Sequence, residues 1–461
     1  MPTYDLVIRG GLVAAATGTA RADVGIRSEK IAQIGGDMAG TRELDASGRL
    51  VLPGAVDIHV HLTNNPGRRA SPGPAWVDDM TSGSAAAFAG GITTLGNMTF
   101  LGDGELPLEG LAREGLLVRE AAMADFVLHP VIRQPTEATL AQIPQLLAHG
   151  CNDIKFFISM PDFDLNVGGF LEATARAGAA GLITMIHCED HAIMARAARE
   201  LLASGRASMR DYPESRPVVS EVVATERAVA FAAATGAPVY IVHLSSQAAL
   251  DVCRRAQSAG LPVYVETRPL YLHLSRERFA EPDGAKYVGQ PPLREAADVE
   301  DLWRGLAQGA IHTVCSDHAP WSLAAKLDPD LNVATVRPGV ADLETEYPML
   351  YSEGVRKGRI SLERFVEVTA TNVAKLFGLY PTKGCIAVGS DADIAIWDPD
   401  LTRTVGAPAF SRADYSPYDG WQVTGWPVTT LRRGEVVYQD GQVAAHPGSG
   451  RLLHRGPTRP L

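Results

Sequence analysis

Residues 53–61 read Pro-Gly-Ala-Val-Asp-Ile-His-Val-His, and this stretch predicts a buried strand with a candidate site at its end. Residues 55–58 are largely apolar, and His59 and His61 follow them. On a strand, residues i and i+2 point to the same side, so both imidazoles can reach one metal ion. The ordinary alternative is two unrelated polar residues at a strand end. The rest of the chain decides between these interpretations.

Similar apolar runs recur along the chain and alternate with helix-like segments. Runs of this length are typical of strands buried on both faces of a parallel sheet. The predicted strands are 55–60, 93–98, 125–132, 153–158, 182–187, 239–244, 263–267 and 312–317, and the clearest helices are 140–148, 168–179, 220–235 and 246–259. Eight such strands predict an α/β fold of the (β/α)8 TIM barrel type, with a doubly wound open sheet as the competing architecture. The barrel is favoured because the chemical residues stand at the carboxyl ends of several different strands.

The two ends of the chain have a different pattern. Short strand-like runs occur at 5–9, 22–26, 30–34, 392–397, 429–433 and 435–439. Two β-rich ends around an α/β centre predict a small β-sandwich domain built from both termini. The predicted domains are a first sandwich part at 1–52, a catalytic barrel at 53–384, and a second sandwich part with a C-terminal tail at 385–461. Asp391 and Asp393 are interpreted as part of a turn into a strand rather than as a catalytic pair.

Composition narrows the class of protein. Of 461 residues, 46% are hydrophobic and 21% are charged, which is typical of a soluble globular protein. The net charge of −11 and the lack of a dense Lys/Arg run argue against nucleic-acid binding. No apolar run reaches the roughly 18–20 residues needed to span a membrane, and no secretory signal is evident. Five scattered cysteines are typical of reduced thiols in a cytoplasmic enzyme.

Two more histidines end apolar runs, at His187 and His243. A single histidine in such a place is usually a structural or surface residue. Four imidazoles that converge from several strands would instead make a strong site for zinc or a similar ion. The histidines interpreted as structural are His129, His149, His273 and His454.

Lys155 and Asp317 are the remaining candidates, and each has two interpretations. Lys155 interrupts an apolar run, where burial of an ammonium is costly. Its residue type alone favours a lysine whose head reaches solvent at the barrel mouth over a carbamate that bridges two divalent ions. Asp317 follows the last predicted strand, where it either caps the next helix or binds a metal and transfers a proton from the bridging water.

The order H-x-H, K, H, H, D on predicted strands 1, 4, 5, 6 and 8 resembles the amidohydrolase superfamily. More narrowly, the chain resembles the cyclic amidases, which are the hydantoinases, dihydropyrimidinases and allantoinases. The similarity runs nearly end to end and includes residues 53–61, 90–94, 243–245, 291–294, 374–381 and 389–393. This resemblance implies that Lys155 is carboxylated.

The resemblance also implies a centre of two divalent metal ions, with zinc as the default. His59, His61 and Asp317 would hold the more buried ion, and His187 and His243 the second. Carboxylated Lys155 and a hydroxide would lie between the two ions. The hydroxide would open the ring of a small cyclic amide, of the hydantoin or dihydropyrimidine type, to an N-carbamoyl amino acid, with Asp317 as general base and acid. Manganese, cobalt or iron would also suit such ligands. Members of this group usually form dimers or tetramers, which implies a homo-oligomer.

Candidate substrate-binding positions depart from the pattern of dihydropyrimidinases and D-selective hydantoinases. Met160 stands where many of them carry a tyrosine, and Gln290 where a serine is usual. Pro338 and Gly339 stand in place of Asn-Gly, and the proline removes a backbone donor. Two interpretations are equally open: an allantoinase or another cyclic ureide or imide hydrolase, or drift in loops that contact substrate through backbone atoms.

Two functions of other classes are weighed against this one. A non-catalytic, dihydropyrimidinase-related scaffold loses metal ligands, whereas all six ligand positions here keep residues able to bind metal. A one-metal deaminase on the same barrel would not need Lys155. Arg68 and Arg69, in the Gly/Pro-rich loop 64–75, either meet an anionic substrate or are solvated charges.

Overall fold

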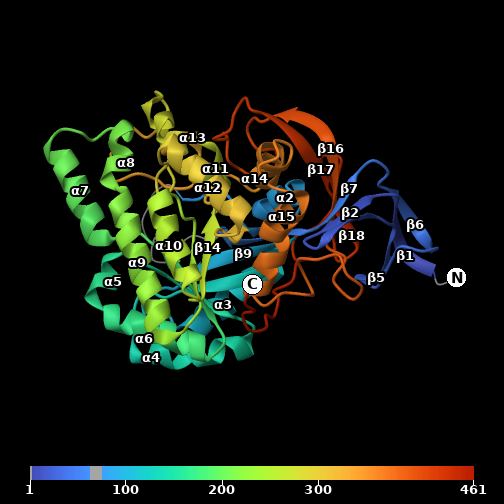
Figure 1. Cartoon of the computed structure of the whole chain (residues 1–461), viewed down its shortest axis with the longest axis horizontal. Coiled ribbons are helices and arrows are strands. Elements are labelled where there is room, and N and C mark those ends of the chain that lie inside the picture. Colours follow the sequence, from blue (N-terminus) through green and yellow to red (C-terminus); the bar gives the residue numbers. More distant parts are fainter. Residues whose placement is uncertain (1–2, 63–74) are drawn as a thin grey trace.

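The computed structural model describes residues 3–62 and 75–461, and shows a strand barrel ringed by helices with a β-sandwich beside it (Figure 1). Arg68 and Arg69 lie outside the described residues. The barrel sheet runs in chain order from β8 to β15, with parallel pairing throughout. Its strands are β8 (Ala55–Val60), β9 (Ile92–Phe100), β10 (Asp125–Val131), β11 (Asp153–Phe157), β12 (Ile183–His187), β13 (Val239–Ile241), β14 (Val263–Thr267) and β15 (Thr313–Val314).

The first and last strands of this sheet meet, which closes the barrel. Val60 and His318 form a parallel bridge, and the backbone N–H of His61 donates to the carbonyl oxygen of His318 at 2.8 Å. The (β/α)8 prediction is therefore confirmed, and the open sheet is excluded.

Two barrel strands end three residues earlier than predicted. β13 ends at Ile241 rather than at residue 244, and β15 ends at Val314 rather than at residue 317. His243 and Asp317 have positive φ angles of 36° and 50°, which L-residues rarely adopt and which no strand ladder accommodates. Both side chains therefore project from loops at the carboxyl ends of their strands, where backbone strain often marks a functional site.

Helices surround the barrel, and α10 illustrates how the sequence encodes them. The Ser246 side chain accepts a hydrogen bond from the backbone N–H of Ala249 and so caps the helix start. Ala249, Val252, Cys253 and Ala256 recur at helical spacing and are buried. The helices are α2 (Met80–Ala89), α3 (Pro107–Ala121), α4 (Glu137–Gln142), α5 (Pro161–Leu165), α6 (Val167–Ala179), α7 (His191–Ala203), α8 (Tyr212–Ser215), α9 (Val218–Thr235), α10 (Gln247–Ser258), α11 (Pro269–His273), α12 (Ala296–Gln308), α13 (Leu323–Lys326), α14 (Glu346–Leu350), α15 (Leu362–Val366) and α16 (Asn372–Leu376).

Three of the four predicted helices match α6, α9 and α10 to within two residues at each end. The fourth prediction, 140–148, is wrong in type: α4 ends at Gln142, and a 3₁₀-helix (Ile143–His149) follows it. Pro144 has no backbone N–H with which to continue the α-helical hydrogen bonds, which explains the change.

The β-sandwich has one sheet from the N-terminal residues alone and one sheet from both ends of the chain. The four-stranded sheet, in the order β5-β4-β1-β6, lies at the opposite end of the molecule from α7 and α8 (Figure 1). In the seven-stranded sheet, in the order β19-β18-β17-β16-β7-β2-β3, pairing of β7 with β16 joins the two chain ends. The strands are β1 (Thr3–Arg9), β2 (Leu12–Ala15), β3 (Gly18–Arg21), β4 (Val24–Arg27), β5 (Lys30–Ile34), β6 (Ala39–Asp45), β7 (Leu50–Pro53), β16 (Ile394–Thr404), β17 (Gln422–Arg432), β18 (Glu435–Gln439) and β19 (Gln442–Val443). The predicted sandwich from both termini is confirmed.

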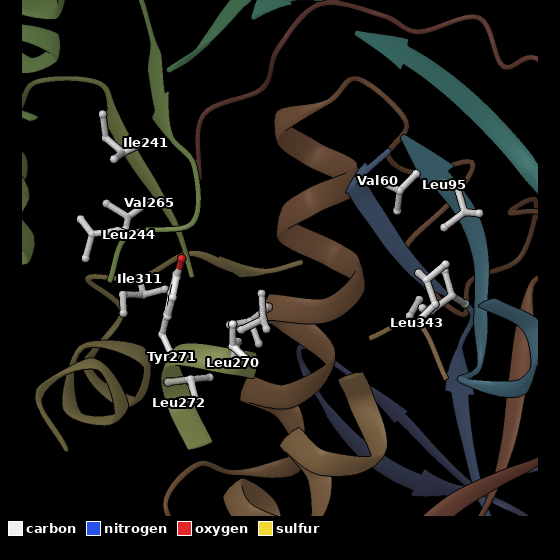
Figure 2. Close-up of a cluster of buried hydrophobic side chains, with 14 of the residues drawn as sticks. Val60, Leu95, Ile241, Leu244, Val265, Leu270, Tyr271, Leu272, Ile311 and Leu343 are labelled. Atoms are coloured by element: carbon white, nitrogen blue, oxygen red, sulfur yellow. The ribbon is translucent and has the colours of Figure 1, made fainter. Parts of the chain in front are cut away.

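The sandwich and the barrel each have a hydrophobic core of their own. Leu6, Ile26 and Val51 pack with Ile394 and Leu431 between the two sandwich sheets. The barrel's outer core is larger, and Figure 2 shows Leu270 and Leu272 of α11 beside Val265 and Ile311. Burial of each such side chain contributes about 1.5–3 kcal/mol relative to exposure.

The last residues of the chain run across the barrel end opposite to the carboxyl ends of the strands. Phe126 at the start of β10 donates its backbone N–H to Arg451, and Leu453 donates to Phe126. Arg455 is buried there and forms an ion pair with Asp153 at the start of β11. Within the described part of the chain, no helix is both long and apolar enough to cross a membrane.

Candidate metal centre

The predicted metal ligands gather at the carboxyl ends of the barrel strands, and all of them are buried. The imidazole rings of His59 and His61 lie 5.5 Å apart, those of His59 and His243 5.4 Å, and those of His187 and His243 4.6 Å, between ring centres. β8 provides His59, β12 provides His187, and the loops after β8 and β13 provide the other two histidines.

Three of the residues bring ligand atoms to one point. Asp317 Oδ1 lies 3.0 Å from His61 Nε2 and 3.3 Å from His59 Nε2. The three ligand atoms all lie within 4.8 Å of one another. Two imidazole nitrogens and one carboxylate oxygen are donors that zinc and related divalent ions accept, so this trio fits a cation.

Lys155 lies beside these histidines and is the least expected member of the group. Its side chain is 0% exposed, and its Nζ atom has no hydrogen-bond partner among the described residues. The interpretation as a lysine that reaches solvent is therefore wrong. Burial lowers the pKa of Lys155 to about 8, so a minor fraction of the amine is uncharged at neutral pH, far more than for an ordinary lysine.

His187 and His243 also have the character expected of metal ligands. Burial lowers the pKa of His187, and burial with the neighbouring His187 holds the pKa of His243 well below its usual value. Both imidazoles are therefore neutral and able to coordinate a metal ion. His243 Nδ1 has no partner among the described residues.

Two buried glutamates orient the rings. His59 Nδ1 lies 2.8 Å from Glu266 Oε1, and His187 Nε2 lies 2.8 Å from Glu189 Oε2. Glu189 also accepts a hydrogen bond from Arg216 at 2.9 Å. Carboxylates placed in this way fix the tautomer and direction of a ligating imidazole. The sequence reasoning missed both glutamates, although each stands at or just after the end of an apolar run, the signal that identified His187 and His243.

Asp317 does not act as a helix cap. The next helix, α13, begins at Leu323 and is capped by Ser322. The Asp317 Oδ2 atom instead accepts a hydrogen bond from Arg268 Nη1 at 2.7 Å. Burial alone would raise the pKa of Asp317, but the charges of Arg268 and His59 outweigh this effect and hold it well below its usual range.

The predicted substrate positions are only partly brought together. Gln290, Pro338 and Ser159 line one cavity of about 700 Å³. Met160 follows Ser159 at the N-terminus of α5 and does not line that cavity. Gly339 has a φ of +113°, and a Cβ there would lie 2.3 Å from the carbonyl oxygen of Ala319, so backbone geometry by itself explains the glycine.

One buried lysine, which the sequence reasoning missed, joins the two segments that contain these residues. Lys326 Nζ donates to the carbonyl oxygens of Val288 at 2.7 Å, Arg337 at 2.8 Å and Gly339 at 2.9 Å. Trp321 Nε1 donates to the Pro338 carbonyl at 2.8 Å. The wall of the cavity is thus held by hydrogen bonds to backbone carbonyls.

A second acidic group, formed by Asp125, Asp391 and Asp393, lies outside this centre. The Lys383 ammonium already lies among them, at 2.6 Å from Asp125, 2.9 Å from Asp391 and 2.6 Å from Asp393. The group is therefore an ion-pair network between barrel and sandwich. Asp391 and Asp393 serve a structural purpose, as the sequence predicts.

Comparison with known proteins agrees with this geometry. Residues 50–437 match the profile described as the Amidohydrolase family. The chain is 37% identical to a D-phenylhydantoinase of Escherichia coli over 99% of both chains. It matches a D-hydantoinase structure with a TM-score of 0.94 at 34% identity, over 99% of this chain and 100% of that one. A dihydropyrimidinase from Brevibacillus agri gives 0.93 at 34% identity, over 98% and 99% of the two chains. The chain therefore belongs to the amidohydrolase family.

Proposed function

We propose that this chain hydrolyses a ring amide bond of a hydantoin or dihydropyrimidine and releases an N-carbamoyl amino acid. The observation that carries this proposal is the convergence of His59, His61 and Asp317 beside the buried amine of Lys155, which has no hydrogen-bond partner among the described residues. His187 and His243 complete a donor set for two divalent cations, for which zinc is the first choice. The hydantoinase and dihydropyrimidinase relatives support the choice of ring.

Carboxylation of Lys155 is part of this proposal. The uncharged Nζ attacks the carbon of carbon dioxide, forms an N–C bond and loses one proton. One C=O π bond breaks, and the product is a carbamate whose single negative charge is shared by two oxygens, which would suit two neighbouring cations. A partnerless amine in a fully buried site is otherwise a destabilising feature, so the modification also accounts for its placement.

Asp317 is proposed to transfer the proton. Bound divalent ions would supply an acidic water and polarise the ring carbonyl. Asp317 then takes a proton from that water and delivers it to the ring nitrogen as the C–N bond breaks. Glu266 and Glu189 keep His59 and His187 in the tautomers that leave one ring nitrogen free for a cation.

The 700 Å³ cavity is proposed to accept the substituent on the ring. Gln290 and Pro338 line it together with the apolar side chains of Met194, Trp321 and Val336. The apolar walls can bury an apolar substituent favourably, and Arg199, Arg216 and Arg337, which line the same cavity, can bind its polar atoms. A D-phenylhydantoinase is among the relatives, which supports an aryl-substituted hydantoin as the first substrate to test.

The decisive experiment measures metal content and then ring opening. Purified protein is incubated with both enantiomers of 5-phenylhydantoin, with dihydrouracil, allantoin, dihydroorotate and a cyclic imide. We expect metal-dependent opening of at least one hydantoin or dihydropyrimidine. If allantoin or the imide is opened faster than any hydantoin or dihydropyrimidine, the proposed ring class is wrong. If the protein keeps full activity after its metal is removed, the proposed metal centre is wrong.

Lys155→Ala provides the test of the bridging carbamate. The variant should lose metal and nearly all activity, because it removes the proposed link between the two ions. Short carboxylates such as formate should restore part of both. Lys357→Ala, which changes an exposed lysine paired with Glu353, is the control and should behave as wild type. Full metal content and full rate in Lys155→Ala would rule out the binuclear proposal.

A homo-oligomer, either a dimer or a tetramer, is also proposed. Large apolar side chains are exposed on the outer helices, with Leu165 at 84%, Val219 at 52% and Leu202 at 41%. Burial of these side chains against a second copy of the chain would be favourable. Light scattering of the purified chain gives the mass directly, and a monomer at micromolar concentration would contradict this part of the proposal.

A further inference from the structure

An arginine that has no place in the mechanism above lies against Asp317. Arg268 directly follows β14, and its side chain is 0% exposed. Its Nη1 donates to Asp317 Oδ2 at 2.7 Å, while Nε and Nη2 have no hydrogen-bond partner among the described residues. Burial of a guanidinium whose donors lack hydrogen bonds lowers the stability of the fold. A functional role would explain why an arginine occupies this position.

Because of the contact with Arg268, the two oxygens of the Asp317 carboxylate have different partners. Oδ1 lies 3.3 and 3.0 Å from the nitrogens of His59 and His61, whereas Oδ2 contacts the Arg268 guanidinium. Asp317 lies beyond β15 with a φ of 50°, so no strand ladder fixes the direction of its side chain. The direction therefore depends on what holds the carboxylate.

We propose that Arg268 is a positioning residue for Asp317, holding Oδ2 so that Oδ1 remains directed at the cation site of His59 and His61. This inference rests on the proposed function and adds to it the group that controls its proton-transferring carboxylate. Arginine suits the task because its planar guanidinium stays charged and gives directional hydrogen bonds, which a lysine ammonium does not.

The surroundings of Arg268 are built to accommodate it. The guanidinium lies 5.7 Å from the centre of the Tyr271 ring, within cation–π range. Gly289 has no side chain, and a Cβ there would lie 3.3 Å from Arg268 Nη1. The Tyr271 hydroxyl in turn donates to the carbonyl of Pro291 at 2.5 Å. These contacts restrict the guanidinium to the side of Asp317 away from the histidines.

The test compares Arg268→Met and Arg268→Lys with Arg455→Met. Arg455 is also a buried arginine paired with a buried barrel aspartate, Asp153, but it lies at the other end of the barrel. Each metal-free protein is titrated with Co²⁺, and the stoichiometry and visible absorption are recorded. The kcat and KM are then measured on the cyclic amide that the wild-type enzyme opens fastest, and thermal stability is measured for all variants.

In Arg268→Met we expect unchanged Co²⁺ stoichiometry with an altered absorption spectrum, because Asp317 becomes free to bind through both oxygens. We expect kcat to fall about ten- to a hundredfold, the effect of losing one charge-assisted hydrogen bond, with little change in KM. Arg268→Lys should recover part of kcat and of the wild-type spectrum. Arg455→Met should lose thermal stability while it keeps the wild-type spectrum and kcat.

A wild-type spectrum and kcat in Arg268→Met would overturn the inference, and so would the same spectral change in Arg455→Met. Loss of Co²⁺ binding in Arg268→Met would also overturn it, since it would make the arginine a requirement for the site rather than for the direction of Asp317. If the wild-type protein opens no cyclic amide, the proposed function fails, and the Co²⁺ spectra still decide whether Arg268 directs Asp317.

Discussion

At the scale of single residues, Glu266 connects ligands from two different strands. Its Oε1 atom lies 2.8 Å from His59 Nδ1 and also accepts the backbone N–H of His243 at 2.8 Å. One buried carboxylate thus sets a side-chain direction on β8 and a backbone position after β13. The affinity of the site for a cation therefore depends on a residue that need not touch the cation.

Glu266→Gln keeps the shape of this side chain and removes its charge. We expect cation affinity to fall about 10–100-fold, because His59 loses the anionic partner that fixes its tautomer and raises its basicity. Competition with a chelator during Zn²⁺ titration measures the change. Glu300→Gln, at an exposed carboxylate paired with Arg359, is the matched control. Equal affinities in both variants would remove Glu266 from this account.

The sequence predicts the four histidines and Asp317 as candidate ligands because each stands at the end of an apolar strand run, and it adds Lys155 through the family resemblance. It does not predict Arg268, whose partner Asp317 follows another strand and depends on how the barrel closes. It also predicts the wrong environment for Lys155 when residue type alone is considered. Burial of an amine without a partner is too costly for a sequence rule to favour, and only the folded barrel reveals it.

At the scale of elements, α13 holds the two segments that form the cavity wall. Lys326 at its C-terminal end bonds the carbonyls of Val288, Arg337 and Gly339. The backbone N–H of Gly339 also donates to Val288 at 2.9 Å. Gln290 and Pro338 therefore stand on segments fixed to one another.

Lys326→Met removes these three bonds and leaves their carbonyls without that donor. We expect KM to rise more than kcat falls, because the metal ligands lie on other elements, and stability to fall by about 1–3 kcal/mol. Steady-state kinetics and thermal unfolding measure the two effects. Lys286→Met is the control, since that ammonium pairs with Asp283 instead. A change confined to kcat would contradict the assignment of these segments to substrate binding.

The sequence pattern predicts the bounds of some strands correctly and those of others wrongly. The periodicity places β8, β14 and β18 at their observed bounds, because apolar runs there coincide with the hydrogen-bonded ladder. It extends β13 and β15 too far, since a left-handed residue within an apolar run is not visible in the sequence. The predicted domain bounds at residues 52 and 384 stay predictions.

At the scale of the whole molecule, the Lys383 ammonium joins the barrel to the sandwich. Asp125 belongs to β10, whereas Asp391 and Asp393 lie at or just before the start of β16. Burial raises the pKa of Asp125, but the charges of Lys383 and Arg433 outweigh this effect and lower it. The contact between barrel and sandwich therefore depends on buried charges of opposite sign that compensate one another.

Lys383→Met leaves these carboxylates buried without their shared cation. We expect a loss of about 3–5 kcal/mol, the usual result of removing one partner from a buried ionic group. Scanning calorimetry should show a lower unfolding temperature. Lys30→Met is the matched control: Lys30 pairs with the same Asp391 at 2.5 Å but is 45% exposed, so its loss should cost at most about 1 kcal/mol. Similar losses in both variants would contradict the structural importance of Lys383.

The pairing of β7 with β16 has a consequence for biosynthesis. Leu50–Pro53 leave the ribosome about 340 residues before their neighbours Ile394–Trp397. At ordinary translation speeds this edge of β7 waits roughly 20–70 s for its partner. During that time the nascent chain presents an unpaired strand to other chains, so its yield in cells depends on whatever shields that strand until synthesis is complete.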